Sequence, residues 1–239
     1  MASEREGGRR ANQLRPIDCS RNVISRAHGS ASCSHGETRV IAAVYGPKAG
    51  TKKNENPEKA SIEVIWKPKT GQSGKPEKEF EMILKRTLQN ICVLNVHPNT
   101  TTSIIVQVVH DDGSVSFSHL EFNCLTSLRY GIQVRDFHRI MGKERSPNYK
   151  SLRCLGIVAI SCCLTESGQI ILDPSKIEEQ KMKAFVYLAF PSSVQSVLPE
   201  GPTSGIITSL THGVIPVDDY FQCVEQGRAA ITPLSNILK

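Results

Sequence analysis

The pattern of apolar and polar positions in the first half of the chain predicts several strands. Within ASIEVIWKPK, alternate residues are apolar, which is typical of a strand with one buried face. These residues are Ile62, Val64 and Trp66. A small-residue strand ending near Ser34, the turn HGE and an apolar strand over residues 38–45 together predict a hairpin. The run TTSIIVQVVH predicts a buried strand, and the sequence DDG after it predicts a turn.

Between Glu77 and Cys92 the apolar residues recur at helical spacing and form one stripe. They are Phe80, Ile83, Leu84, Leu88, Ile91 and Cys92. The opposite side carries Lys78, Lys85 and Gln89, with Arg86 nearer the flank. This stretch therefore predicts an amphipathic helix with a polar, mostly cationic outer side.

Regular patterning returns in the last third of the chain. Two strands, LGIVAISCCL and QIILD, are joined by the turn TESG, and a helix over residues 174–183 leads into the strand AFVYLAF. A Ser/Pro/Gly-rich linker over 191–205 precedes the strand GIITSLTHG and a last helix from about Val217 to Ala230. This mixture of strands and helices predicts an α/β protein.

Composition indicates one globular domain. With 239 residues, of which 39% are hydrophobic, the chain is long enough to bury a substantial core. The polar, glycine-bearing residues 1–15 are expected to be disordered, which leaves a single domain over 16–239. No apolar run approaches the ~20 residues of a membrane-spanning helix, and no apolar stretch follows the first charges as in a secretory signal. We therefore expect no membrane partner and a nuclear or cytosolic location.

The spacing of the cysteines and the distribution of charge narrow the possible kinds of binding site. The eight cysteines include no CxxC pair, which argues against a zinc knuckle and predicts reduced, mostly buried thiols. Most of the net charge of +6 falls between Arg129 and Arg153. The bulk charge is therefore a property of one segment and only weak evidence for a basic binding face.

The stretch ILDPSKIEEQ holds the candidate chemistry. Asp173 and Glu179 follow an apolar strand, and a pair of carboxylates could hold a metal or transfer a proton during phosphodiester cleavage. Alternatively, Asp173 caps a helix with Pro174 at its first position, while Glu178 and Glu179 complement the helix dipole. From the residues alone the capping interpretation is favoured.

Several longer motifs resemble the RNase PH family. The opening LRPIDCSRNVISRAHGSASCSHGETRVIAAVYGP carries most of the resemblance, which covers about residues 14–115 and 155–230. In the family's order there follow IEVIWKPKTG, LKRTL, VQVVHDDGS, GIVAISCC, ILDPSKIEE and THGVI. The resemblance implies an RNase PH-type fold, in which mixed β-sheets pack against helices and subunits pair into a ring around a channel for single-stranded RNA. Active members cleave RNA from its 3′ end with phosphate as the attacking group.

The resemblance also implies a set of site residues. Where active members bind phosphate through Gly-Thr-Arg-Thr, residues 113–116 read Gly-Ser-Val-Ser. Val115 supplies neither the charge nor the donors of arginine, although Ser114 could donate one hydrogen bond. Asp173 and Glu179 match the two catalytic acids in position, with glutamate where the family usually has aspartate. The longer side chain shifts a carboxylate whose placement must be correct to about half an ångström.

Contacts to RNA are expected from basic residues before and within the predicted helix. Arg86 in LKRTL matches an arginine that active members direct at RNA or phosphate; the alternative is an ordinary solvated residue on a helix flank. Lys75 and Lys78 lie in a flexible basic loop, and with Lys85 they are candidate contacts to the RNA backbone.

Residues 116–153 depart from the family pattern. Instead of a helix rich in Ala and Cys, the chain has a longer, more basic segment without sustained helical or alternating periodicity. A lineage-specific replacement and translated intron sequence would each explain this difference. We expect residues 131–153 to be mobile.

Three functional hypotheses follow. The first is a non-catalytic ring subunit of the RNA exosome, which scaffolds other RNase PH-fold subunits and threads RNA in the nucleus, nucleolus and cytoplasm without a cofactor. The second is a metal-dependent hydrolytic nuclease for RNA or DNA, a homodimer in which Asp173 and Glu179 hold magnesium. The third is a protein-interaction subunit that never touches RNA. Val115 favours the first because the phosphate site lacks its arginine.

Overall fold

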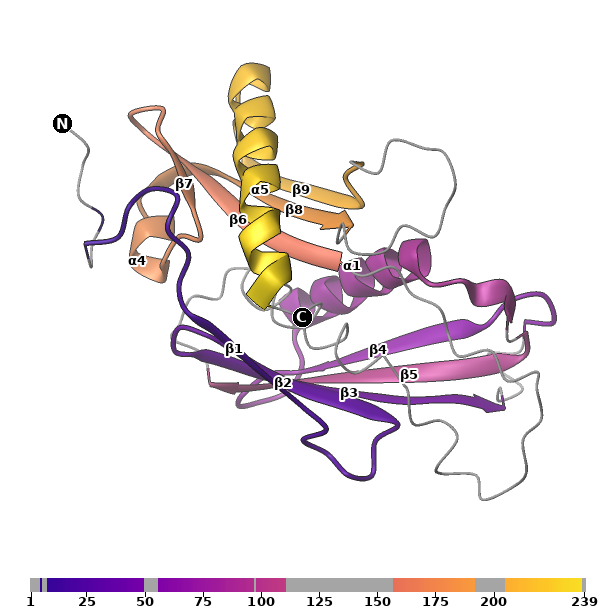
Figure 1. Cartoon of the computed structure of the whole chain (residues 1–239). Coiled ribbons are helices and arrows are strands. Elements are labelled where there is room, and N and C mark those ends of the chain that lie inside the picture. The colour runs from indigo at the N-terminus through magenta and orange to yellow at the C-terminus, as the bar shows by residue number, and fades with distance from the viewer. Residues whose placement is uncertain are drawn as a thin grey trace.

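The chain folds into two β-sheets with helices packed against them (Figure 1). The computed structural model describes Arg5 and residues 8–49, 56–96, 98–110, 157–191 and 205–237. The first sheet has five strands in the order β1-β2-β3-β5-β4, and the second has four in the order β7-β6-β8-β9. Helix α1 lies between the sheets in Figure 1, and residues of both sheets and of helices α1 and α5 form one hydrophobic core. The expected α/β arrangement of mixed sheets packed against helices is confirmed.

The first sheet contains the hairpin and the parallel pair that organise the N-terminal half. Its strands are β1 (Ile17–Arg21), β2 (Gly29–His35), β3 (Thr38–Ala49), β4 (Ser61–Lys67) and β5 (Thr100–His110). His35 lies opposite Thr38, so Gly36 and Glu37 form the turn of the expected hairpin, and Gly36 has the positive φ of 62° that glycine adopts readily. Strands β4 and β5 are parallel, and α1 supplies the crossover between them.

Helix α1 (Lys75–Ile91) covers the inner face of this sheet through its predicted apolar stripe. Trp66 of β4 packs against Phe80, with ring centroids 5.3 Å apart, and Leu84 is completely buried. Glu81 accepts a hydrogen bond from the backbone N–H of Trp66 at 2.8 Å. Because β4 is an edge strand, this bond gives a partner to one backbone N–H that no neighbouring strand can pair with. A short turn of 3₁₀ helix, η1 (Leu94–Val96), follows.

The second sheet differs from the sequence prediction at two helix boundaries. Its elements are β6 (Ile157–Thr165), β7 (Ile170–Leu172), α4 (Lys176–Glu179), β8 (Met182–Pro191), β9 (Thr208–Gly213) and α5 (Val217–Ile237). The helix predicted over 174–183 is much shorter, because β8 already pairs with β6 from Met182 onward. Helix α5 runs past Ala230, because Ile231 and Leu234 are buried in the core. Among the helices that the structure describes, none is long and apolar enough to cross a membrane.

An N-terminal strap, Arg5 together with residues 8–15, lies along the free edge of β7. The backbone N–H of Leu172 donates to the carbonyl of Ala11 at 2.9 Å, and the Arg5 side chain is buried. From their polar, glycine-bearing composition, residues 1–15 are instead expected to be disordered. The difference arises because the strap's arginines meet buried carboxylates, which composition alone does not reveal.

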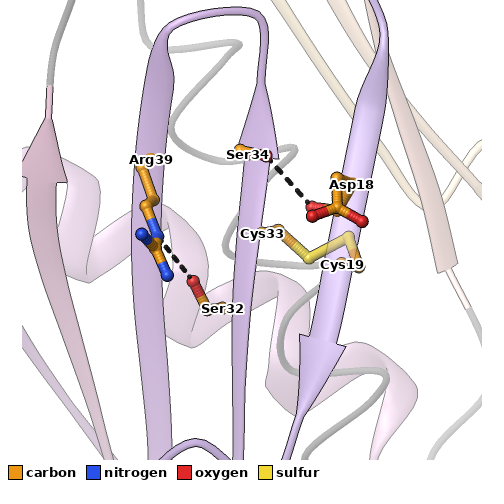
Figure 2. Close-up of a disulfide and its surroundings, with 6 residues drawn as sticks. All are labelled: Asp18, Cys19, Ser32, Cys33, Ser34 and Arg39. Carbon is orange, nitrogen blue, oxygen red and sulfur yellow. Dashed lines mark hydrogen bonds between the residues drawn. A yellow bond between two sulfur atoms is a disulfide. The ribbon is translucent and has the colours of Figure 1, made fainter.

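A disulfide joins the first two strands of the chain (Figure 2). Cys19 on β1 lies directly opposite Cys33 on β2, with 4.2 Å between the Cα atoms. The expectation of reduced thiols is wrong for this pair, because the antiparallel register brings together two residues 14 positions apart. The other described cysteines are reduced and buried, as expected, and burial raises the pKa of Cys163 to about 12. Those four are Cys92, Cys162, Cys163 and Cys223.

Candidate functional site

Asp173 follows β7 directly and is only 1% exposed. Its positive φ of 52° turns the chain away from the strand, a conformation that aspartate tolerates better than most residues. The backbone N–H of Arg15 donates to Oδ2 at 2.7 Å, and the Arg15 guanidinium Nη2 donates to Oδ1 at 2.9 Å. Arg9 Nη1 lies 3.4 Å from Oδ2, and His35 Nε2 lies 3.1 Å from it. Three basic side chains therefore surround this carboxylate.

Glu178, on α4, holds the buried Arg5 in a two-pronged ion pair. Arg5 Nη2 and Nε lie 2.7 and 2.8 Å from the two carboxylate oxygens, and Arg5 also donates to the carbonyls of Leu172 and Asp173. Burial acts to raise the pKa of Glu178. Hydrogen bonds from Arg5 and the Ser175 N–H, together with nearby positive charges, outweigh burial and lower this pKa below its usual value. The carboxylate is therefore ionised at neutral pH.

These five side chains form what we call the arginine–carboxylate cluster. Its members are Arg5, Arg9, Arg15, Asp173 and Glu178. Because the arginines belong to the strap and the acids to the β7–α4 segment, the cluster joins the start of the chain to the second sheet. Burial and the charge of Arg5 lower the pKa of Arg9, which reflects how closely the guanidinium groups are packed.

The start of α4 is capped by a residue other than the predicted one. The Ser175 N–H donates to Glu178 Oε2 at 2.7 Å, and the Glu178 N–H donates to Ser175 Oγ at 3.4 Å. This reciprocal pair is a capping box. Asp173 instead directs its carboxylate at the strap, so the prediction that Asp173 caps the helix is wrong.

The geometry offers Asp173 little freedom to hold a cation. Both of its oxygens accept hydrogen bonds from Arg15, and a metal would have to displace these donors. Glu179 is half-buried, and its N–H donates to the carbonyl of Ser175. Within the described ranges, no group of three or more His, Cys, Asp or Glu side chains is arranged to bind a metal. The catalytic and metal roles of Asp173 and Glu179 stay predictions.

The four candidate RNA contacts lie on one exposed face of α1, which we call the α1 basic face. They are Lys75, Lys78, Lys85 and Arg86. The expectation that Lys75 and Lys78 lie in a flexible loop is wrong, because α1 begins at Lys75 and includes both. From the first to the last of these residues the helix rises about 17 Å, at ~1.5 Å per residue. None of the four forms an ion pair with another residue in the part of the chain that the structure describes. Their charges are available to an anionic ligand.

The sequence-predicted residues do not converge on one place. Helix α1 and the β7–α4 segment lie well apart in Figure 1, so the basic face and Asp173 belong to different regions of the molecule. Ser114 and Val115 fall outside the described residues, as does the segment 116–153 with its expected mobility.

Sequence reasoning missed the strap arginines and His35. The available signal was the position of Asp173 itself: a carboxylate directly after a buried strand needs a charged or hydrogen-bonding partner. The opening of the chain, with several arginines before its first strand, could have supplied that partner.

Comparisons with known proteins agree with this fold. The RNase PH family model, described as the 3′ exoribonuclease family, domain 1, matches residues 13–169, a range that runs through residues 116–153. The exosome complex exonuclease RRP46 homolog of Arabidopsis thaliana is 57% identical, with 98% of this chain and 94% of that protein covered. The homolog of the same name from Oryza sativa subsp. japonica is 48% identical, with 100% and 95% covered.

Solved structures give the same picture. The crystal structure of rice Rrp46 aligns with a TM-score of 0.80 at 49% identity, covering 98% of this chain and 97% of that one. An archaeal exosome core chain aligns with a TM-score of 0.73 at 15% identity, covering 98% and 91%, and shares the fold. With a family model that matches well over half of its residues and relatives similar over nearly their whole length, the chain belongs to the RNase PH family of 3′ exoribonucleases.

Proposed function

We propose that this chain is a non-catalytic ring subunit of an RNA exosome. It supports 3′-to-5′ RNA processing and degradation, including ribosomal RNA maturation, by holding other RNase PH-fold subunits and guiding single-stranded RNA. The observation that carries the proposal is 57% identity over nearly the full length of a protein named as an exosome RRP46 homolog. The subunit acts in the nucleus, nucleolus and cytoplasm and needs no cofactor of its own.

Two features support a non-catalytic role. Asp173, the first candidate acid, is buried and paired with Arg15 and Arg9 rather than facing solvent. Val115 stands where active family members have the phosphate-binding arginine, so the chain lacks the charge that would position the attacking phosphate. A subunit with these features contributes shape and contacts instead of chemistry.

The α1 basic face supports contact with RNA. Its four cations are exposed along one helix, and such side chains bind a phosphate backbone without reading sequence. This suits a ring that passes RNA of any sequence.

A cleavage assay tests the catalytic status. The purified chain is incubated with 5′-labelled single-stranded RNA and DNA and magnesium, with and without phosphate, beside Asp173→Asn and Glu179→Gln variants whose melting temperatures are checked. We expect no cleavage. Magnesium-dependent cleavage without phosphate that both variants lose would identify a hydrolytic nuclease instead. Phosphate-dependent cleavage would mean that another residue replaces the arginine missing at Val115.

Co-expression tests the scaffold role. The chain is produced with the other RNase PH-fold subunits of its exosome, and we expect it to co-purify in a ring at equal stoichiometry. An Arg86→Glu variant should still assemble but bind single-stranded RNA more weakly. Unchanged RNA binding by the variant ring would favour a subunit that only contacts proteins.

A further inference from the structure

The start of α5 exposes an unusual group of apolar side chains. Val214, Val217 and Phe221 are 77%, 68% and 59% exposed, whereas their neighbour Tyr220 is half-buried against the core and the fully buried residues of α5 begin at Cys223. In Figure 1 the start of α5 extends beyond the strands of the second sheet, and Tyr220 of its first turn contacts β9 through a hydrogen bond to Ser209. Apolar side chains gathered in this way on a surface commonly mark an interaction site.

Acidic residues accompany these apolar side chains along the first turns of α5. Asp218 and Glu225 are exposed, Asp219 is half-buried, and none of the three forms an ion pair within the described ranges. We call this surface the acidic–apolar patch; it comprises Val214, Val217, Asp218, Asp219, Phe221 and Glu225. Arg228 is exposed one turn of α5 beyond Glu225, and against this cation the three carboxylates leave the local charge negative on a chain whose net charge is +6.

An open strand edge lies next to the patch. β9 is the last strand of the second sheet, and Val214 follows it directly. Ser209 of β9 and Tyr220 of α5 share a hydrogen bond of 2.9 Å between their hydroxyl oxygens, which fixes the helix start beside the strand. The opposite edge of the same sheet, β7, is covered by the N-terminal strap. One edge is thus covered by the chain's own residues, while β9 has no partner strand on its outer side in the described part of the chain.

The negative charge of the acidic–apolar patch indicates which kind of molecule it binds. A nucleic acid would be repelled by the three carboxylates. A second copy of this chain, related by a two-fold axis, would place the same acids against one another. A protein that presents basic side chains around an apolar surface fits both the rim and the centre of the patch.

We propose that the acidic–apolar patch is the docking surface for a neighbouring protein subunit of the ring, one that presents basic side chains around an apolar contact. The inference rests on the proposed function, because it names the partner chemistry of one face of that subunit. Phe221 and Val217 supply the buried centre of the contact. Asp218 and Glu225 steer the partner and set the salt dependence of association.

The test measures binding of the full-length chain to the co-expressed RNase PH-fold subunits that assemble with it. Val217→Ser/Phe221→Ser should weaken binding by about tenfold or more, as expected when central apolar contacts are removed. Asp218→Lys/Glu225→Lys should slow association and reverse its salt dependence. Ile177→Ser is a matched control, because Ile177 is 53% exposed on α4, outside the patch. All these residues are exposed, so each variant should keep the wild-type melting temperature.

The outcomes separate the two proposals. If the wild-type chain assembles with the RNase PH-fold subunits and the patch variants bind them equally well, the patch is not the docking surface, and the scaffold role stands. A wild-type chain that joins no RNase PH-fold subunit would overturn both. Loss of a homodimer in the Phe221→Ser variant, seen by analytical ultracentrifugation, would assign the patch to a second copy and overturn the basic partner. Weaker RNA binding by the isolated patch variant would likewise contradict the proposal of a basic protein partner.

Discussion

Replacing Arg5 with methionine should lower the free energy of unfolding by about 3–5 kcal/mol at neutral pH, the usual cost of leaving one charge of a buried pair without its partner. The Arg5 side chain is 2% exposed and that of Glu178 is 6% exposed, so water reaches neither group freely. Methionine keeps an apolar stem of similar length, so the change removes the charge and its hydrogen bonds while retaining most of the packing. Loss of the donors to Leu172 and Asp173 adds to the effect.

The pH dependence follows from the lowered pKa of Glu178. A carboxyl whose pKa is depressed on folding stabilises the protein fully above its unfolded-state value, about 4.3 for glutamate. That contribution is lost as the pH falls from this value through the lower folded-state pKa. The wild-type protein should therefore lose stability in this acidic window, and the Arg5→Met variant should lose less over the same range.

Equilibrium unfolding in urea measures both effects. Trp66 is the only tryptophan of the chain and is 2% exposed, so its fluorescence should report the exposure of the core on unfolding. Arg10→Met is the matched control, because Arg10 lies in the same strap but its side chain is exposed. A double variant, Arg5→Met with Glu178→Gln, should recover much of the loss, because glutamine removes the uncompensated charge and keeps an oxygen that can accept the Ser175 N–H.

One result would refute the reasoning. If Arg5→Met changes the unfolding free energy no more than Arg10→Met does, then the ion pair with Glu178 does not hold the strap. A double variant that is less stable than Arg5→Met would also contradict the account, because the uncompensated charge would then not be the cause of the loss.

Three further predictions concern the rest of the fold and the RNA contacts. Reducing the β1–β2 disulfide with dithiothreitol should lower the unfolding free energy by about 3 kcal/mol, as expected for a loop of this length, and a Cys19→Ser variant should not respond to the reductant. Leu84→Ala should cost about 2–5 kcal/mol, whereas the exposed Met82→Ala should cost less than about 0.5 kcal/mol; equal losses would contradict the burial of the α1 stripe. Replacing Lys78 and Lys85 with alanine should reduce the salt dependence of RNA binding by the assembled ring, lowering the slope of log K against log salt by about 1.4; an unchanged slope would exclude both contacts.

The local features of the fold were predictable because short-range patterns determine them. The alternation at Ile62, Val64 and Trp66 reports directly which face of β4 is buried, and the apolar stripe of α1 matches its buried side. The prediction of a helix over 174–183 was too long because pairing of β8 with β6 outweighs local helix propensity.

The candidate site was harder because its contacts are distant in sequence. Arg5 and Glu178 are separated by 173 residues, and Arg15 and Asp173 by 158. No pattern within a short window reveals such a pair, so polar composition was interpreted as disorder and Asp173 as a helix cap. The same limit hid the disulfide, because only the strand register places Cys33 opposite Cys19.

The strap also has a consequence for how the protein is made. Arg5 is synthesised 173 residues before Glu178, which corresponds to roughly 9–35 s at ~5–20 residues per second of translation. All strands of the first sheet lie before residue 111, so that sheet can pair while the strap arginines remain in water. The start of the polypeptide therefore reaches its native position only after about three-quarters of the 239 residues have been synthesised.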